Sequence, residues 1–181
     1  MSRFLYFVLF GSLCFSIGAC KKTKFADPHK QTQENTPISV YSNSTIYYSK
    51  DALLTAKIQA ETRMDYENND QKFPDGIFIE MFDEQGKLKT TLKADSAIHN
   101  YKEQRYQAIG NVIVNNVQEQ NELKTVELNW DKKTRKIYTD SAVVITTPQN
   151  ILKGIGLVSD QEFKHPTILE PTGTISLSEN N

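Results

Sequence analysis

Cysteine is almost absent from the sequence. Only Cys14 and Cys20 occur among the 181 residues, and both lie near the N-terminus. A domain formed by the rest of the chain therefore has no internal disulfide and no cysteine-ligated metal site. The three histidines, His29, His99 and His165, lack the His-x-x-x-His or Glu-x-x-His spacing of a metal site. We expect no metal, no cofactor, and a fold that depends on its apolar core.

An excess of positive charge is also lacking. Lys and Arg number 21 against 22 Asp and Glu, a balance that does not favour nucleic acid as a partner. The chain has no Gly-x-Ser-x-Gly nucleophile motif and no phosphate-binding loop. Asp95, Asp131, Asp140 and Asp160 fall near expected turns, where capping of the backbone explains them better than acid–base catalysis. The sequence therefore predicts that the protein is not an enzyme.

The N-terminus has the features of an export signal. Arg3 precedes residues 4–19, an uncharged apolar stretch that is shorter than the roughly 20 residues of a membrane-spanning helix. The stretch ends in small residues before a cysteine, Ile17-Gly18-Ala19-Cys20, which resembles the bacterial lipobox. We expect residues 1–19 to be a lipoprotein signal peptide and Cys20 to carry the acyl chains that anchor the protein. The alternative is an uncleaved apolar helix.

Residues 20–45 are expected to form a flexible tether. This segment is rich in Lys, Gln, Asn, Thr and Ser, contains Pro28 and Pro37, and has no apolar period. The folded domain is therefore expected to cover residues 46–181.

Apolar residues in this domain alternate with a period of two, which is typical of half-buried β-strands. Leu54, Ala56, Ile58 and Ala60 show the pattern clearly. Similar segments, separated by turn residues, run over residues 77–82, 88–95, 106–114, 123–130, 136–146, 152–159 and 174–177. No segment has a helical stripe, so the sequence predicts an all-β fold.

An internal repeat sharpens this prediction. At an offset of 31 residues Leu92 corresponds to Leu123, and without a gap Ala97 meets Leu128, His99 meets Trp130, Tyr106 meets Ile137, Val112 meets Val143 and Val114 meets Ile145. The repeated unit is a β-hairpin, and stacked antiparallel hairpins would share one apolar face. The repeat also places Gly110 inside a strand, at a bulge, although Gly110-Asn111 alone reads as a hairpin turn.

The ordered set of motifs resembles the OstA-like domain and is most similar to the LptC family of lipopolysaccharide export components. The resemblance covers roughly residues 52–177 and rests on Ala94-Asp95-Ser96-Ala97, Ala108-Ile109-Gly110-Asn111-Val112-Ile113-Val114, Leu123-Lys124-Thr125-Val126-Glu127-Leu128-Asn129-Trp130-Asp131, Ile137-Tyr138-Thr139-Asp140 and Gly154-Ile155-Gly156-Leu157. It implies a twisted open β-jellyroll. Better-known members are anchored in the membrane by a spanning helix, whereas this chain carries a sequence that resembles a lipobox.

The resemblance also implies a function. Such a protein receives lipopolysaccharide from an inner-membrane ABC transporter of the LptB, LptF and LptG type, and passes it to an LptA-like bridge protein. The expected location is the periplasmic side of the inner membrane, with a lipid anchor. Two alternatives are a generic envelope lipoprotein of the same fold that binds another ligand, and an LptA-like bridge protein.

The candidate site residues follow from this function. An apolar interior would accept acyl chains, although the same residues suit an ordinary β core. Unpaired edge strands would add to the sheets of neighbouring proteins, and Thr174, Ile175, Ser176 and Leu177 are expected to form the outgoing edge. The candidate lipid-binding residues are Leu54, Ile58, Leu88, Leu92, Val112, Val114, Leu128, Trp130, Val143 and Ile145.

Overall fold

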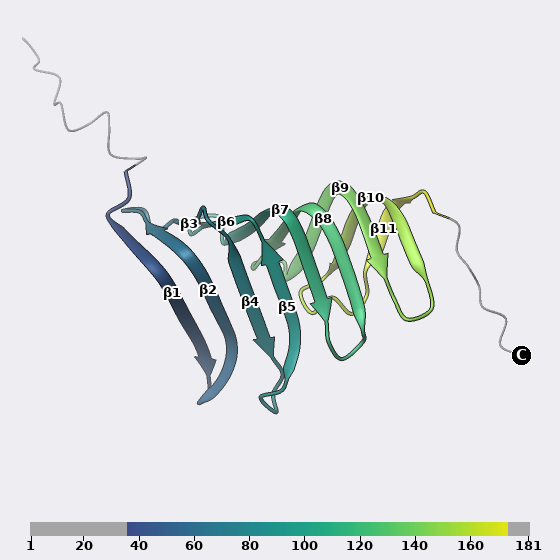
Figure 1. Cartoon of the computed structure of the whole chain (residues 1–181), viewed down its shortest axis with the longest axis horizontal. Helices are drawn as coiled ribbons and strands as arrows, with labels where there is room; N and C mark the ends of the chain where they lie inside the picture. The colour runs from purple at the N-terminus through teal and green to yellow at the C-terminus, as the bar shows by residue number, and fades with distance from the viewer. Residues whose placement is uncertain (1–35, 174–181) are drawn as a thin grey trace, which may run out of the picture. The chain divides into compact units, whose positions relative to one another are not determined.

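The computed structural model describes residues 36–173, which form a single antiparallel sheet of eleven strands (Figure 1). This confirms the predicted all-β jellyroll. No helix in the described part of the chain is long and apolar enough to cross a membrane. The strands are β1 (Ser39–Lys50), β2 (Leu53–Asp65), β3 (Gln71–Phe73), β4 (Ile77–Phe82), β5 (Leu88–Ala94), β6 (Ser96–Asn100), β7 (Arg105–Asn116), β8 (Asn121–Asp131), β9 (Lys136–Thr146), β10 (Ile151–Asp160) and β11 (Thr167–Pro171).

The sheet is an up-and-down meander. β3 and β4 are two halves of one bent strand, because β2 pairs with both of them. β5 and β6 are likewise two halves, since β7 pairs with both. When each pair of halves is counted as one strand, every strand lies beside the strand that precedes it in the chain, from β1 at one edge to β11 at the other (Figure 1). Hairpin connections of this kind need only short turns.

A line of bends crosses the strands and folds the sheet over on itself. The bends occur at Gly76 between β3 and β4, at Asp95 between β5 and β6, at Gly110 in β7 and at Gly156 in β10. The three glycines have positive φ angles of 99°, 77° and 73°, which a residue without Cβ adopts at little cost. The register of β7 with β8 shifts around Gly110, and the register of β9 with β10 shifts at Gly156. The predicted bulge at Gly110 is confirmed.

Gly110 is the most constrained of these bends. A Cβ at this position would lie 2.6 Å from the Asp95 Oδ2 atom and 2.9 Å from the Asp95 Cβ atom. We expect Gly110→Ala to destabilise the domain by about 3 kcal/mol, since the contact adds to the left-handed backbone strain. Gly86→Ala is the matched control, because its φ is +75° but no atom lies within 4 Å of the added Cβ. Its expected cost is about 1 kcal/mol in urea denaturation. Equal losses for the two variants would contradict this account of the bend.

The start of the domain differs from the prediction. β1 begins at Ser39, so residues 39–45 are a paired strand and not part of a tether. Only one side of β1 is paired, and Val40, Tyr41 and Tyr47 are exposed. Because β1 lies at the edge and buries few side chains, its sequence lacks the alternation that marks the other strands. The predicted strand at residues 174–177 lies outside the described residues, and the last described strand is β11.

One cluster of buried side chains fills the space inside the folded sheet. It includes Val112, Leu123, Val143 and Leu157, which are almost inaccessible to solvent. These residues come from β7, β8, β9 and β10. Partly buried apolar side chains from β1, β2 and β4, such as Ile46, Ile58 and Ile79, pack against the same cluster. The interior is therefore one continuous core.

Candidate functional site

The interior contains most of the residues predicted to bind lipid. Five of them are buried members of the core, namely Val112, Val114, Leu128, Val143 and Ile145. Three more are partly buried and pack against it, namely Ile58, Leu92 and Trp130. Leu54 and Leu88 are partly buried outside this cluster. The structure brings eight of the ten together, and their contact with lipid stays a prediction.

The repeat of 31 residues appears in the structure as equivalent strand pairs. Leu92 pairs with Val114 in one unit, and Leu123 pairs with Ile145 in the next. At the other end of the hairpins, His99 pairs with Tyr106 and Trp130 pairs with Ile137. The turns are also equivalent, since Gln104 and Arg135 have φ angles of 57° and 56°. The units therefore share one register as well as one apolar pattern.

This register places three aromatic rings in a row across β6, β7 and β8. The His99 ring stacks on Tyr106 with centroids 4.0 Å apart and an interplanar angle of 5°. Tyr106 stacks on Trp130 with centroids 4.8 Å apart. The row lies on the inner face, because Ala108 on β7 and Leu128 on β8, each two residues away from a ring of the row, belong to the core. Aromatic residues thus line one end of the interior.

The loop between β10 and β11 inserts a large side chain into the same interior. Phe163 is only 1% exposed and belongs to the core, although no strand contains it. Its φ angle is +54°, a conformation that is rare for an aromatic residue. A strained backbone persists only where its surroundings hold it. The contacts of this loop must therefore stabilise it.

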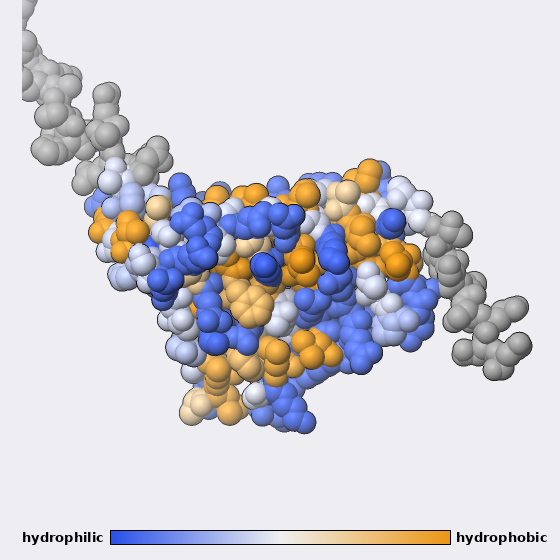
Figure 2. Space-filling model, in the orientation of Figure 1, coloured by the Kyte–Doolittle hydropathy of each residue, from blue (hydrophilic) through white to orange (hydrophobic). Residues whose placement is uncertain are grey.

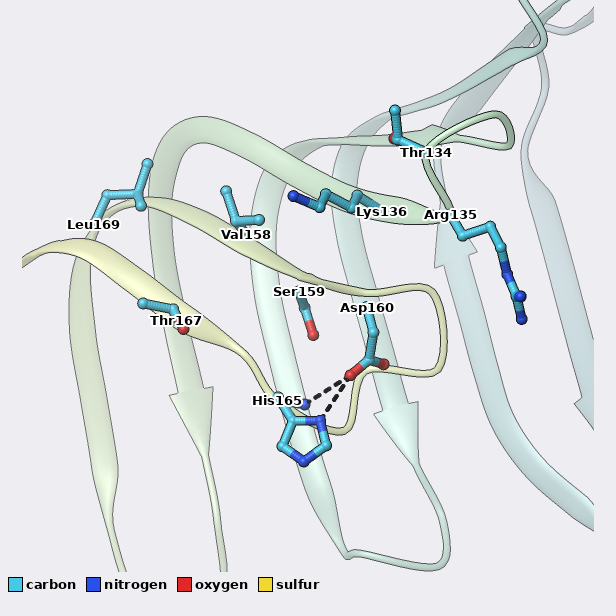
Figure 3. Close-up of a pocket in the computed structure, with 9 residues that line it drawn as sticks. All are labelled: Thr134, Arg135, Lys136, Val158, Ser159, Asp160, His165, Thr167 and Leu169. Carbon is cyan, nitrogen blue, oxygen red and sulfur yellow. Dashed lines mark hydrogen bonds and ion pairs between the residues drawn. The ribbon is translucent and has the colours of Figure 1, made fainter.

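Two carboxylates fasten the loop. The Asp160 carboxylate accepts hydrogen bonds from the backbone N–H groups of Glu162, Lys164 and His165, and its Oδ2 atom lies 2.9 Å from His165 Nδ1. Figure 3 shows the His165 ring turned toward Asp160. The Glu162 carboxylate binds Lys164 Nζ at 2.6 Å and Lys89 Nζ at 2.7 Å. Lys89 belongs to β5, so the loop spans from the C-terminal hairpin to a strand that is not its neighbour in the sheet.

These contacts predict a loss of stability in acid. The hydrogen bonds from Lys164 and then Lys89 lower the pKa of Glu162 from 4.5 to about 2. Because the folded pKa lies below the unfolded pKa, this stabilisation is complete above the unfolded pKa and is lost as the pH falls from about 5 toward 2. We expect Glu162→Gln to reduce the midpoint of thermal unfolding at pH 7, and the difference from wild type to shrink between pH 5 and pH 3. Melting curves that stay equally separated at both pH values would contradict this role.

The end of β10 and this loop bring a serine, an aspartate and a histidine close together, but not as a catalytic triad. A shallow pocket of about 530 Å³ is lined by Ser159, Asp160 and His165, among others (Figure 3). The Ser159 hydroxyl is buried and makes no hydrogen bond, whereas a nucleophile must be exposed and bonded to its base. The hydrogen bonds of Asp160 are those of a turn cap, as the sequence predicts. Asp131 caps its turn in the same way, through the N–H groups of Lys133 and Thr134.

The two edge strands each have a free side. Within residues 36–173, β1 pairs only with β2 and β11 pairs only with β10. Exposed apolar side chains accompany both edges, including Val40 and Tyr47 on β1 and Leu169 on β11. Figure 2 shows apolar patches at both ends of the face in view. Free backbone groups beside apolar side chains are suited to pairing with a strand of another protein.

Some predicted site residues lie outside residues 36–173, and one residue of the interior was not predicted. Cys20, and the proposed edge at Thr174, Ile175, Ser176 and Leu177, lie outside the described residues. Phe163 was not predicted, because an apolar period of two marks strands and gives no signal for a single apolar residue in a loop. The available signal is a single Phe between Asp160 and Pro166 in an otherwise polar turn. No group of three or more His, Cys, Asp or Glu in residues 36–173 could hold a metal ion.

Comparison with known proteins agrees with this geometry. A family model described as LptC, lipopolysaccharide-assembly, LptC-related, matches residues 5–175. No curated protein matches the chain. The family match covers nearly the whole sequence, and it confirms the resemblance that the strand motifs indicate. The chain belongs to the LptC family, and its role lies in lipopolysaccharide transport.

Proposed function

We propose that this protein receives lipopolysaccharide from an inner-membrane ABC transporter of the LptB, LptF and LptG type and passes it to an LptA-like bridge protein. The observation that carries the proposal is the pair of free edges at opposite ends of a sheet whose inner face is apolar. A link in a protein bridge needs two docking edges and a path between them. The structure offers features that suit both requirements.

The inner face supports the acyl-chain part of the proposal. Its side chains come from strands between the two edges, including Leu92 on β5, Val112 on β7 and Val143 on β9. Transfer of an acyl chain from water to such a surface is favourable by about 0.8 kcal/mol of free energy for each buried CH₂ group. Because these side chains pack against one another without lipid, entry of an acyl chain would displace them. The β10–β11 loop, which holds Phe163 in the interior, is the segment we expect to move first.

The edges support the docking part. β1 is close to the N-terminal anchor in the sequence, so it would face the transporter in the membrane. β11 would then pair with the bridge protein, together with the segment at residues 174–177. Backbone hydrogen bonds supply the affinity of such strand addition, and flanking side chains supply the specificity.

We also propose that acylated Cys20 holds the protein on the periplasmic side of the inner membrane. Two or more acyl chains give stable attachment without a spanning helix. Residues 21–38 would then bridge the distance between the membrane and β1. Mass spectrometry of the cellular protein should show a mature chain that begins at an acylated Cys20. An intact segment of residues 1–19 would contradict this anchor.

Site-specific photo-crosslinking tests the function. A photoreactive residue at Ile58, which is partly buried against the core, should crosslink to lipopolysaccharide in cells. The matched control is Val126, which is 63% exposed on β8 and should give no lipid adduct. At the edges, Val40 should crosslink to the transporter and Leu169 to the bridge protein. Equal lipid yields at Ile58 and Val126 would refute the interior path, and failure of Leu169 to capture a bridge protein would refute the docking edge.

A further inference from the structure

The strongest unexplained feature inside the domain is a set of buried nitrogen atoms without hydrogen bonds. Both ring nitrogens of His99 and the indole Nε1 of Trp130 are buried and have no partner. An unsatisfied buried polar group costs about 1–3 kcal/mol, and native proteins seldom keep one without a reason. Here three such atoms belong to the two outer members of a single stacked row.

The position of the row separates it from the purely apolar part of the interior. Tyr106 and Trp130 lie one residue pair away from the pairs Asn100–Arg105 and Asp131–Lys136, which flank the turns. Trp130 packs against the core with its apolar body. The row therefore marks the place where the apolar interior ends and solvent begins. Tyr and Trp suit such boundaries, because one part of each side chain is apolar and another forms hydrogen bonds.

The chemistry of the row matches a sugar better than an acyl chain or an anion. His99 and Trp130 both stack on Tyr106, so the outer faces of His99 and Trp130 are the ones left for the C–H groups of a sugar ring, and the indole N–H donates to a hydroxyl. Burial lowers the pKa of His99, while Asp70 raises it and Lys132 lowers it, and the net lowering favours the neutral imidazole. A neutral imidazole has one donor and one acceptor, which together match a hydroxyl group. An acyl chain would leave all of these nitrogen atoms unpaired.

We propose that His99, Tyr106 and Trp130 form a subsite for the saccharide part of the transported glycolipid, at one end of the interior that takes the acyl chains. This inference rests on the proposed function and adds a specificity to it. The subsite lets the domain distinguish a glycolipid from a phospholipid of similar chain length. Tyr101, an exposed side chain on the adjacent turn, lies edge-on to His99, so the sugar reaches the row by displacing a surface ring.

Two conservative variants test the subsite. His99→Phe and Trp130→Phe keep an aromatic ring in the row but remove its nitrogen atoms. For each full-length variant we expect the Kd for lipopolysaccharide to rise about tenfold, the effect of losing one hydrogen bond. The Kd for myristate, which has no sugar, should change less than about twofold. Tyr47→Phe is the control, because it also removes one polar atom from an aromatic ring, but Tyr47 is 63% exposed on β1 and lies outside the row.

A second measurement uses the unmodified protein. Trp130 is its only tryptophan, so its fluorescence reports directly on the row. Lipid-free core oligosaccharide should shift or quench this emission in a saturable manner, whereas dextran of the same size should not. This readout does not depend on the folding of any variant.

The outcomes separate the subsite from the function on which it rests. If wild-type protein binds lipopolysaccharide but the two variants bind it equally well, or if core oligosaccharide leaves the emission unchanged, the subsite is wrong and the transport function stands. If the Kd values of the variants for lipopolysaccharide and for myristate rise to the same degree, the row is part of the acyl path and the subsite is again wrong. If wild-type protein binds neither ligand, the proposed function fails.

Discussion

Val143→Asp is expected to destabilise the domain severely. The side chain of Val143 is 1% exposed and belongs to the buried core. It pairs with Thr125 on β8 and with Gly154 on β10, so it lies inside the sheet and not at its edge. A carboxylate at this position would be surrounded by apolar side chains without a charged partner. We expect a loss of about 4 kcal/mol in the free energy of unfolding, a large share of the 5–15 kcal/mol typical of a domain.

Val126→Asp is the matched control. Val126 lies on β8 and is 63% exposed, so the same substitution there should change stability by less than about 0.5 kcal/mol. Urea denaturation followed by circular dichroism gives both values. A well-folded Val143→Asp protein at neutral pH would show that the interior is hydrated or open in solution. That result would favour a pre-formed lipid channel over a packed core.

This expectation affects how the lipid path is tested. A charge at a fully buried position weakens the fold together with any transport, so loss of function there identifies no lipid contact. Positions that are partly buried against the core, such as Ile58 and Leu92, are better probes. They tolerate a change more readily, because their side chains already reach the surface.

The sequence predicts the architecture because the strands in the middle of the sheet bury one face each. Alternation at residues 106–114, 123–130 and 136–146 reflects this burial directly, and the repeat places equivalent residues at equivalent registers. Both signals weaken at the edges. β1 buries little, and β11 has only five residues, so neither produces the apolar period of a central strand. The edges are also where the proposed partners dock.

The candidate site was only partly predictable for a related reason. The apolar period and the repeat show which residues face inward. They also show that Trp130 and His99 occupy equivalent positions of the repeat. They do not show that the rings of His99, Tyr106 and Trp130 stack, because stacking depends on the side-chain rotamers of three strands. Nor do they show that Phe163 fills the interior. A loop returns to the core only through contacts between distant residues, such as the ion pair of Glu162 with Lys89.

Gly154→Ala is expected to release β11 from the sheet while the rest of the domain stays folded. An added Cβ would lie 2.5 Å from the Glu170 carbonyl oxygen and 3.0 Å from Pro171 Cα, and it would also overlap the Ile168 side chain. Two of these three neighbours are backbone atoms of β11, so a change of rotamer cannot relieve the clash. Ile168 packs against the core, and its displacement adds to the cost. We expect docking of β11 to weaken by about 2–3 kcal/mol.

The effect should be local, because β11 pairs only with β10 among the described residues. Amide hydrogen exchange should therefore accelerate in residues 167–170 but not in β7 or β8. If β11 is the docking edge, the variant should also fail to retain the bridge protein in a pull-down. Gly173→Ala is the control on the same edge, since its nearest contact would be 3.3 Å from Lys153 N. Unchanged exchange in β11 would refute the steric argument. Faster exchange in β11 with normal retention of the bridge protein would instead show that β11 is not the docking edge.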